Sequence, residues 1–271
     1  MVGRVDCAVE AHIHSVTATE LATVLGDRSG PLVSTVEHVL AALRGMSVDN
    51  ALIEVDGPEA PILDGSAADF VAAIDQVGIE TLDAPRRFIK ILKPVRIARD
   101  GLVGELAPWA RGFRVEAEIN FDHPLIGRQM RVLDVDPDSF RREVARARTF
   151  GFMKDVSRLW SAGYALGASL DNTLVVSEDR VLNADGLRYP DEFVRHKILD
   201  AIGDLALAGL PLLGMYRSVR GGHRLNHEVL SALLADSSAW TVVEGDAVPR
   251  GRGHAEVATG LVAPAYGPDV S

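Results

Sequence analysis

The sequence predicts an α+β protein in two parts, and three observations support this prediction. Each half of the chain contains short alternating or β-branched runs that are followed by paired helical segments. The segment 84–87, Ala-Pro-Arg-Arg, is typical of a linker and separates the halves. No apolar run approaches the roughly 18 residues of a transmembrane helix. We therefore expect a first α+β domain over residues 1–84 and a second over residues 85–271.

Composition narrows the class of protein further. The 271 residues are 47% hydrophobic, which is enough for a substantial core. A net charge of −10 disfavours non-specific nucleic-acid binding, so no nucleic-acid partner is expected. The single cysteine, Cys7, excludes an internal disulfide framework and suits a reducing compartment. With no signal peptide visible, the sequence predicts a cytoplasmic protein.

The first half is expected to alternate short strands with helices. Ser34, with Glu37 three residues later, predicts a capping box at the start of a helix over residues 34–45. Both faces of this helix carry apolar or small residues, so we expect it to be covered on both sides. Ser66 and Asp69 form a second capping pair before another helix. The expected strands are residues 13–19, 21–25 and 49–56.

The second half is expected to begin with strands and to end with long helices. The expected strands are residues 88–92, 95–98, 113–121, 172–177, 180–182 and 215–219. The expected helices cover residues 139–148, 153–162, 191–209 and about 225–233. The first of these helices carries four arginines, which either bind phosphate or form an ordinary solvated face: Arg141, Arg142, Arg146 and Arg148.

The helix over residues 191–209 carries the most informative pattern. At about 100° per residue, one stripe of this helix contains four polar side chains. They are His196, Lys197, Asp200 and Asp204. An imidazole and a carboxylate at positions i and i+4 are neighbours on a helix and can reach one cation. An amphipathic surface helix would show the same periodicity, so a third ligand is needed to support a metal site.

The best candidate for the third ligand is His38, which follows Glu37 on the doubly covered helix. Glu37 and His38 are then a carboxylate and an imidazole on a mostly buried element, where an unpaired charge is costly. The alternative is that Glu37 only caps the helix and that His38 is a core histidine with a backbone partner. His223 lies beside the start of the last helix, where an imidazole stays charged only if an anion compensates. Without such a partner, His223 is a surface histidine.

Several motifs then occur in one order between about residue 16 and about residue 240. They are Ser34 to Leu43, Asp49-Asn50, Pro61 to Ala68, Ala147 to Met153, Asn183 to Arg188, Phe193 to Leu205 and Gly222-His223. This series closely resembles the UDP-3-O-acyl-N-acetylglucosamine deacetylases, the zinc amidases that commit Gram-negative bacteria to lipid A biosynthesis. The resemblance implies two α+β domains of similar topology, with helices sandwiched between the sheets and the active site at the domain interface.

The resemblance also implies a set of site residues. The Zn²⁺ ligands are His38, His196 and Asp200, with water in the open position. Glu37 corresponds to the general base, and His223 to the acid that Asp204 keeps charged and oriented. Thr149 matches the donor to the oxyanion. Lys197 matches a lysine that holds the substrate or the oxyanion, and Phe150 matches an aromatic residue beside the sugar.

We therefore expect a monomeric hydrolase that removes the acetyl group from UDP-3-O-acyl-N-acetylglucosamine, a nucleotide-sugar acyl substrate. By similarity, residues of about 150–190 form an insert that encloses the acyl chain. Family members carry further residues before the equivalent of Ala8, so the first domain is expected to lack N-terminal strands. Either the start is misassigned or the copy is truncated. The alternatives are a truncated non-catalytic homologue that binds zinc or substrate without turnover, and a zinc hydrolase of another amide.

Overall fold

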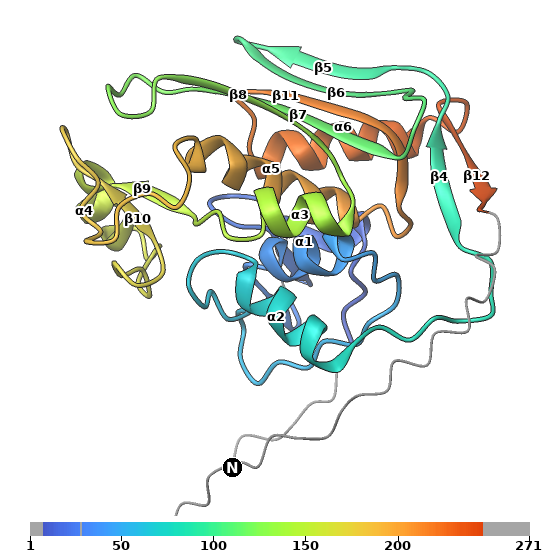
Figure 1. The fold of residues 1–271 in the computed structure, drawn as a ribbon, viewed down its shortest axis with the longest axis horizontal. Helices are drawn as coiled ribbons and strands as arrows, with labels where there is room; N and C mark the ends of the chain where they lie inside the picture. Colours follow the sequence, from blue (N-terminus) through green and yellow to red (C-terminus); the bar gives the residue numbers. More distant parts are fainter. Residues whose placement is uncertain (1–7, 28, 246–271) are drawn as a thin grey trace, which may run out of the picture.

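A seven-stranded sheet forms one face of the molecule in the computed structural model, which describes residues 8–27 and 29–245 (Figure 1). Its strands are β4 (Arg87–Ile91), β5 (Val95–Arg99), β6 (Leu102–Ala107), β7 (Phe113–Asn120), β8 (Arg128–Asp134), β11 (Leu212–Val219) and β12 (Trp240–Glu244). Strand β11 lies in the centre, parallel to β4 and β7 and antiparallel to β6. Alternate side chains of β7 are buried, as expected for a sheet with one covered face.

Two smaller sheets lie elsewhere in the molecule. The strands β1 (Val16–Ala18), β2 (Val24–Gly26) and β3 (Leu32–Val33) form an antiparallel sheet after a 3-10 turn, η1 (Ile13–Ser15). The strands β9 (Phe150–Phe152) and β10 (Leu174–Val176) form a parallel pair. Between them lie η2 (Met153–Asp155) and α4 (Val156–Ser161), and this insert projects at one end of the molecule (Figure 1).

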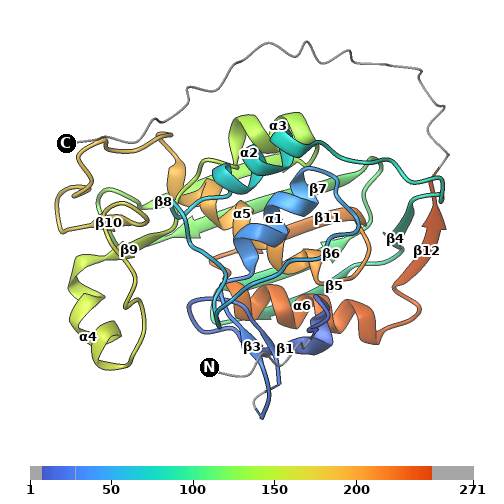
Figure 2. The same cartoon turned by 90° about the horizontal axis from the view of Figure 1, so that it is seen from below.

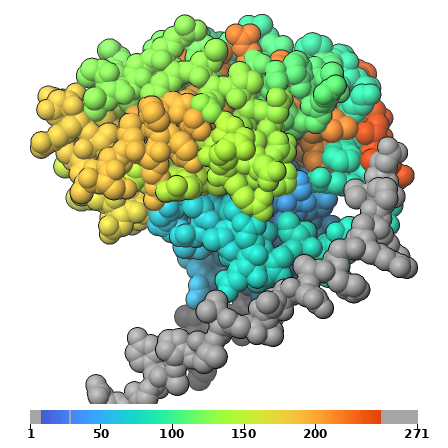
Figure 3. Space-filling model, in the orientation of Figure 1, coloured from blue at the N-terminus to red at the C-terminus, as the bar shows by residue number. Residues whose placement is uncertain are grey.

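The remaining helices are stacked beneath the large sheet. They are α1 (Glu37–Gly45), α2 (Ala68–Val77), α3 (Pro137–Glu143), α5 (Glu192–Ala206) and α6 (His223–Ala235). Helices α5 and α6 lie against the sheet, and α1 packs on the far side of α5 (Figures 1 and 2). On the face seen in Figure 3, the first part of the chain, blue to cyan, sits directly against the second part, green to orange. Helix α5 is therefore the central layer.

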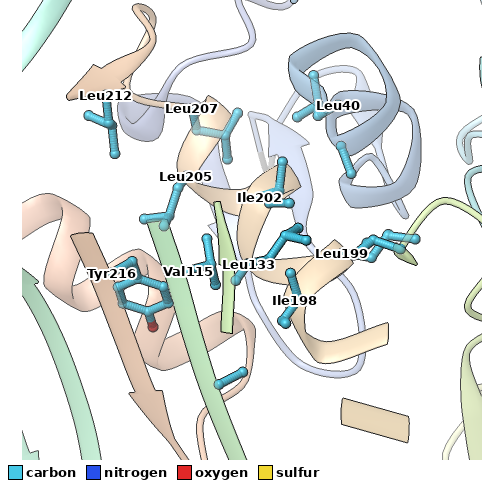
Figure 4. Close-up of a cluster of buried hydrophobic side chains, with 14 of the residues drawn as sticks. Leu40, Val115, Leu133, Ile198, Leu199, Ile202, Leu205, Leu207, Leu212 and Tyr216 are labelled. Carbon is cyan, nitrogen blue, oxygen red and sulfur yellow. The ribbon is translucent and has the colours of Figure 1, made fainter. Parts of the chain in front are cut away.

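The core is built around α5. Its apolar side chains Ile198 and Ile202 are fully buried, and they face β7, β8 and α1 (Figure 4). Helices α1 and α5 approach closely at Gly203, where an added Cβ would be 2.0 Å from the carbonyl oxygen of Glu37. A glycine is needed there because any side chain would push α1 away from α5.

The structure confirms the predicted α+β class and the double cover of the helix that begins near residue 34. Helix α5 matches the expected helix over residues 191–209, and β4, β5, β7 and β11 match expected strands. Strands β6, β8 and β12 were not predicted. Among the described residues, no helix is both long enough and apolar enough to cross a membrane. The division between residues 84 and 85 stays a prediction.

Both predicted capping boxes are wrong. Helix α1 begins at Glu37 and has no side-chain cap, because the Ser34 hydroxyl donates to the carbonyl of Pro58 instead. Helix α2 begins at Ala68 after the uncapped residue Ala67. The Ser66 hydroxyl accepts from the Ala68 amide and donates to Asp64, so it forms a turn before the helix rather than the expected box.

Three predicted element bounds are also corrected. Residues 49–56 do not form a strand, because no neighbouring strand pairs with them in the described part of the chain. Helix α3 ends at Glu143, five residues earlier than expected, because the chain turns there towards the loop at residues 144–149. Residues 180–182 form only an isolated bridge between Val181 and Val176.

Candidate metal centre and active site

The structure brings the three predicted metal ligands together at the contact between α1 and α5. Atoms of His38, His196 and Asp200 that could bind a metal lie within 4.8 Å of one another, and all three residues are buried. The His196 Nε2 atom lies 3.2 Å from Asp200 Oδ1, and His38 Nε2 lies 3.8 Å from the same oxygen. One turn of α5 thus supplies two groups, as the i, i+4 spacing predicts.

Hydrogen bonds orient these groups for metal binding. The Nδ1–H group of His196 donates to the carbonyl oxygen of Ala147 at 2.9 Å, which leaves the Nε2 lone pair facing the cluster. The His38 Nδ1 and Asp200 Oδ1 atoms are buried and have no hydrogen-bond partner among the described residues. Buried polar atoms without a partner are unusual in folded proteins. A cation at this point would satisfy Asp200.

The ionisation states also fit a cation. Burial and the neighbouring His196 lower the pKa of His38 to about 3, so its imidazole is neutral. Burial raises the pKa of Asp200, but His196 and Lys197 outweigh burial and hold that pKa well below its ordinary value. Two imidazoles and one carboxylate form a ligand set that leaves a fourth tetrahedral position open. The residues therefore fit Zn²⁺.

Glu37 and His223 lie beside this cluster and face each other. The Glu37 Oε1 atom is 3.9 Å from His223 Nε2, and Glu37 Oε2 accepts a hydrogen bond from the Thr23 amide at 3.0 Å. Burial raises the pKa of Glu37 to about 7, and the nearby His223 opposes this rise. A carboxylate with this pKa can accept a proton near neutral pH. The alternative that Glu37 only caps its helix is wrong, since its carboxylate is bound outside the helix.

His223 has the anionic partner that its position requires. Its Nδ1–H group donates to Asp204 Oδ2 at 2.8 Å. Burial lowers the pKa of His223, but the carboxylates of Asp204, Asp200 and Glu37 outweigh burial and raise the pKa to about 9. The imidazole is therefore charged at neutral pH and can act as an acid.

Two residues around Asp204 were missed at the level of sequence. The Thr23 hydroxyl donates to Asp204 Oδ1 at 2.6 Å, and the Asn226 amide donates to Asp204 Oδ2 at 2.7 Å. Asn226 lies three residues after His223 on α6, so helical spacing could have indicated it. No local pattern points to Thr23, which precedes Asp204 by 181 residues.

The predicted substrate-binding residues Lys197 and Phe150 contact members of the cluster. Lys197 Nζ donates to Asp200 Oδ2 at 2.7 Å and sits 5.7 Å above the Phe150 ring centre. The Phe150 ring in turn meets the His196 ring edge-on, with centroids 6.4 Å apart. Thr149 lies next to Phe150, and its backbone is tied to Gly65 and to Leu174. Lys197 and Phe150 therefore lie beside the metal ligands, and the role of Thr149 stays a prediction.

A cleft of about 240 Å³ opens beside Lys197. Its lining contains one further basic residue, Arg220, and residues 119–122 at the end of β7 and just beyond it. Two of the four arginines over residues 141–148 are paired within the protein. Arg148 is buried against Glu192, and half-buried Arg141 pairs with Asp75. These two guanidinium groups are neutralised within the protein.

Comparison with known proteins agrees with this geometry. The sequence profile of the family described as UDP-3-O-acyl N-acetylglycosamine deacetylase matches residues 1–235. Proteins of Brucella ovis, Brucella canis and Brucella suis, each named UDP-3-O-acyl-N-acetylglucosamine deacetylase, are 56% identical over 235 residues. The match covers 86% of this chain and 82% of each relative. The chain therefore belongs to the UDP-3-O-acyl N-acetylglycosamine deacetylase family.

Proposed function

We propose that this protein is a zinc-dependent deacetylase that hydrolyses the acetamide of UDP-3-O-acyl-N-acetylglucosamine in lipid A biosynthesis. The products are acetate and the free amine. The observation that carries this proposal is the buried cluster of two imidazoles and a carboxylate beside a base and an acid that face each other. The names of the relatives give the substrate.

Each residue in and around the cluster is assigned a separate role in amide hydrolysis. His38, His196 and Asp200 would hold the zinc ion, which supplies a Lewis acid and lowers the pKa of water towards about 7. Glu37 accepts the proton that water loses as it attacks the acetyl carbonyl. His223 donates a proton to the nitrogen as the carbon–nitrogen bond breaks, so that a neutral amine leaves. Asp204 accepts the Nδ1–H hydrogen bond of His223, which orients the ring and keeps it charged.

Two further residues are assigned to the developing negative charge and to the substrate. Thr149, the neighbour of Phe150 in the chain, is assigned as the donor to the oxyanion. Lys197 remains cationic, because Asp200 and other carboxylates outweigh burial and raise its pKa. With Arg220 it lines the same cleft, so we assign the diphosphate to this cleft. Phe150 is assigned to the sugar.

The insert from residue 150 to residue 190 is assigned to the acyl chain. Five of its large apolar side chains are exposed, which suits a surface that covers a hydrocarbon chain. They are Met153, Trp160, Leu166, Leu170 and Leu187. We also propose that the protein is cytoplasmic and monomeric, with its two domains meeting at residues 84 and 85.

Purified protein tests the proposal directly. We expect one zinc ion per chain by plasma mass spectrometry and acetate release from UDP-3-O-acyl-N-acetylglucosamine. His196→Ala and Asp200→Ala should lose both zinc and turnover. Bound zinc without any turnover would instead favour a non-catalytic homologue. Equal turnover of substrate that lacks its acyl chain would favour a hydrolase of another amide.

A further inference from the structure

Thr23 forms hydrogen bonds both to the proposed base, Glu37, and to Asp204, the partner of the proposed acid His223. The residue is buried, with 2% of its surface exposed, and it directly precedes β2. Its amide N–H donates to Glu37 Oε2 at 3.0 Å, and its hydroxyl donates to Asp204 Oδ1 at 2.6 Å. Its carbonyl accepts from the amide of Val36, the residue before α1. Thr23 thus contacts both the start of α1 and the last turn of α5.

These contacts close a ring of four residues. Thr23 contacts Glu37, Glu37 faces His223 at 3.9 Å, His223 donates to Asp204 at 2.8 Å, and Asp204 accepts from Thr23. Without Thr23, the base on α1 and the acid pair on α5 and α6 would be linked only by the longest of these contacts. The ring therefore fixes the base relative to the acid.

We propose that Thr23 is a positioning residue that sets the relative placement of Glu37 and His223, acting on His223 through Asp204. This inference rests on the proposed function, because it assumes that Glu37 and His223 transfer protons in one reaction. Asp204 Oδ2 is shared by His223 and Asn226, whereas Thr23 is the partner found on Oδ1. Loss of the hydroxyl would free the carboxylate to rotate and would misalign the imidazole.

The proposed role requires a hydroxyl group on a small side chain at position 23. Valine has nearly the shape of threonine but cannot donate to Asp204, whereas serine can donate and lacks only a methyl group. Thr35→Val is a matched control. Thr35 lies just before α1, and its hydroxyl also donates to a carboxylate, that of Glu59 at 2.7 Å. Neither Thr35 nor Glu59 belongs to the ring of four residues.

The test compares kinetic constants, zinc content and melting temperature of the three variants. We expect Thr23→Val to lower kcat about 10-fold to 100-fold, the range for a hydrogen bond to a charged group. KM should stay within about twofold and bound zinc should be unchanged, since this is a transition-state effect. Thr23→Ser should recover kcat to within about threefold, and Thr35→Val should retain full kcat. Equal losses in Thr23→Val and Thr35→Val would indicate a structural role and overturn the inference.

A second measurement does not depend on turnover. The Nδ1 proton of His223, identified by its loss in His223→Gln, should give a downfield proton NMR signal because it is bonded to Asp204. In Thr23→Val this signal should shift or exchange with water faster, and in Thr23→Ser it should be kept. An unchanged signal in Thr23→Val would overturn the inference even if the wild-type protein were inactive. Absence of wild-type turnover, by contrast, would count against the proposed function alone.

A double-mutant cycle shows whether Thr23 acts through Asp204. In an Asp204→Asn background, adding Thr23→Val should lower kcat by less than about threefold, because the carboxylate that Thr23 orients is already altered. Fully multiplicative losses would mean that the Thr23 hydroxyl acts elsewhere.

Discussion

Residues 8–84 and residues 85–245 differ sharply in how well they are packed, yet the site needs both. In the first region the strands have two or three residues each, and α2 buries only Val71. In the second region, β7 and β11 have eight residues each, and nearly all of α5 is buried. Helix α1 is the exception in the first region, because it is covered by α5. The first region is thus held mainly through the helix that carries Glu37 and His38.

The close contact between α1 and Gly203 joins the two regions, and disturbing it should have the largest effect on the site. In Gly203→Ala, the new Cβ would lie 2.0 Å from the Glu37 carbonyl oxygen, so α1 must move. We expect turnover and bound zinc to be lost together, with a stability cost of about 1–3 kcal/mol from overpacking. Inductively coupled plasma mass spectrometry measures bound zinc, an activity assay measures turnover, and thermal melting measures stability. Gly57→Ala is the control, since nothing lies within 4 Å of its added Cβ. A fully active Gly203→Ala protein would contradict the contact.

Replacing the base tests whether the first region contributes chemistry as well as a metal ligand. Glu37→Gln should lower kcat by about 10²-fold to 10⁴-fold, the range for loss of a general base, while zinc remains bound. Asp69→Asn changes another acidic residue of the same region, on α2, and should leave kcat unchanged. The same kinetic and metal assays serve both variants. A Glu37→Gln protein with nearly full activity would remove Glu37 from the mechanism.

The pH profile of kcat/KM should have a rising limb from Glu37 in the first region and a falling limb from His223 in the second. Because the base must be deprotonated and the pKa of Glu37 is about 7, kcat/KM should rise with pH through about 7. Because the acid must be protonated and the pKa of His223 is about 9, kcat/KM should fall through about 9. Asp204→Asn removes an anion that raises the His223 pKa, so the falling limb should move to lower pH. A falling limb that stays in place would contradict the assignment of His223.

The smallest effect on the free energy of unfolding is expected for a substitution at an exposed residue of the first region. Leu52 is 84% exposed, so Leu52→Ala should change the free energy of unfolding by no more than about 0.5 kcal/mol. Leu199 on α5 is fully buried, and Leu199→Ala should cost about 2–5 kcal/mol. Urea unfolding of both variants gives the comparison. A large loss in Leu52→Ala would show that residue 52 is covered in solution.

Much of the site could be predicted because its strongest signals are local. The i, i+4 spacing of His196 and Asp200 places both groups on one helical face, and α5 forms almost where its periodicity predicts. The prediction of a strand over residues 49–56 was wrong because strand formation also depends on distant residues. Its alternating pattern is local, but a strand exists only where a neighbour accepts its backbone hydrogen bonds.

The sequence by itself therefore determined the helix that carries two ligands, the α+β class and, through motif resemblance, the family. Only the tertiary structure decided that Glu37 meets His223 rather than capping α1, and that Thr23 bonds to Asp204 across 181 residues. The physical reason is that backbone periodicity fixes which side chains share one face of an element. Which donor meets which acceptor depends on how distant elements pack, and here that packing depends on the close approach of α1 to Gly203.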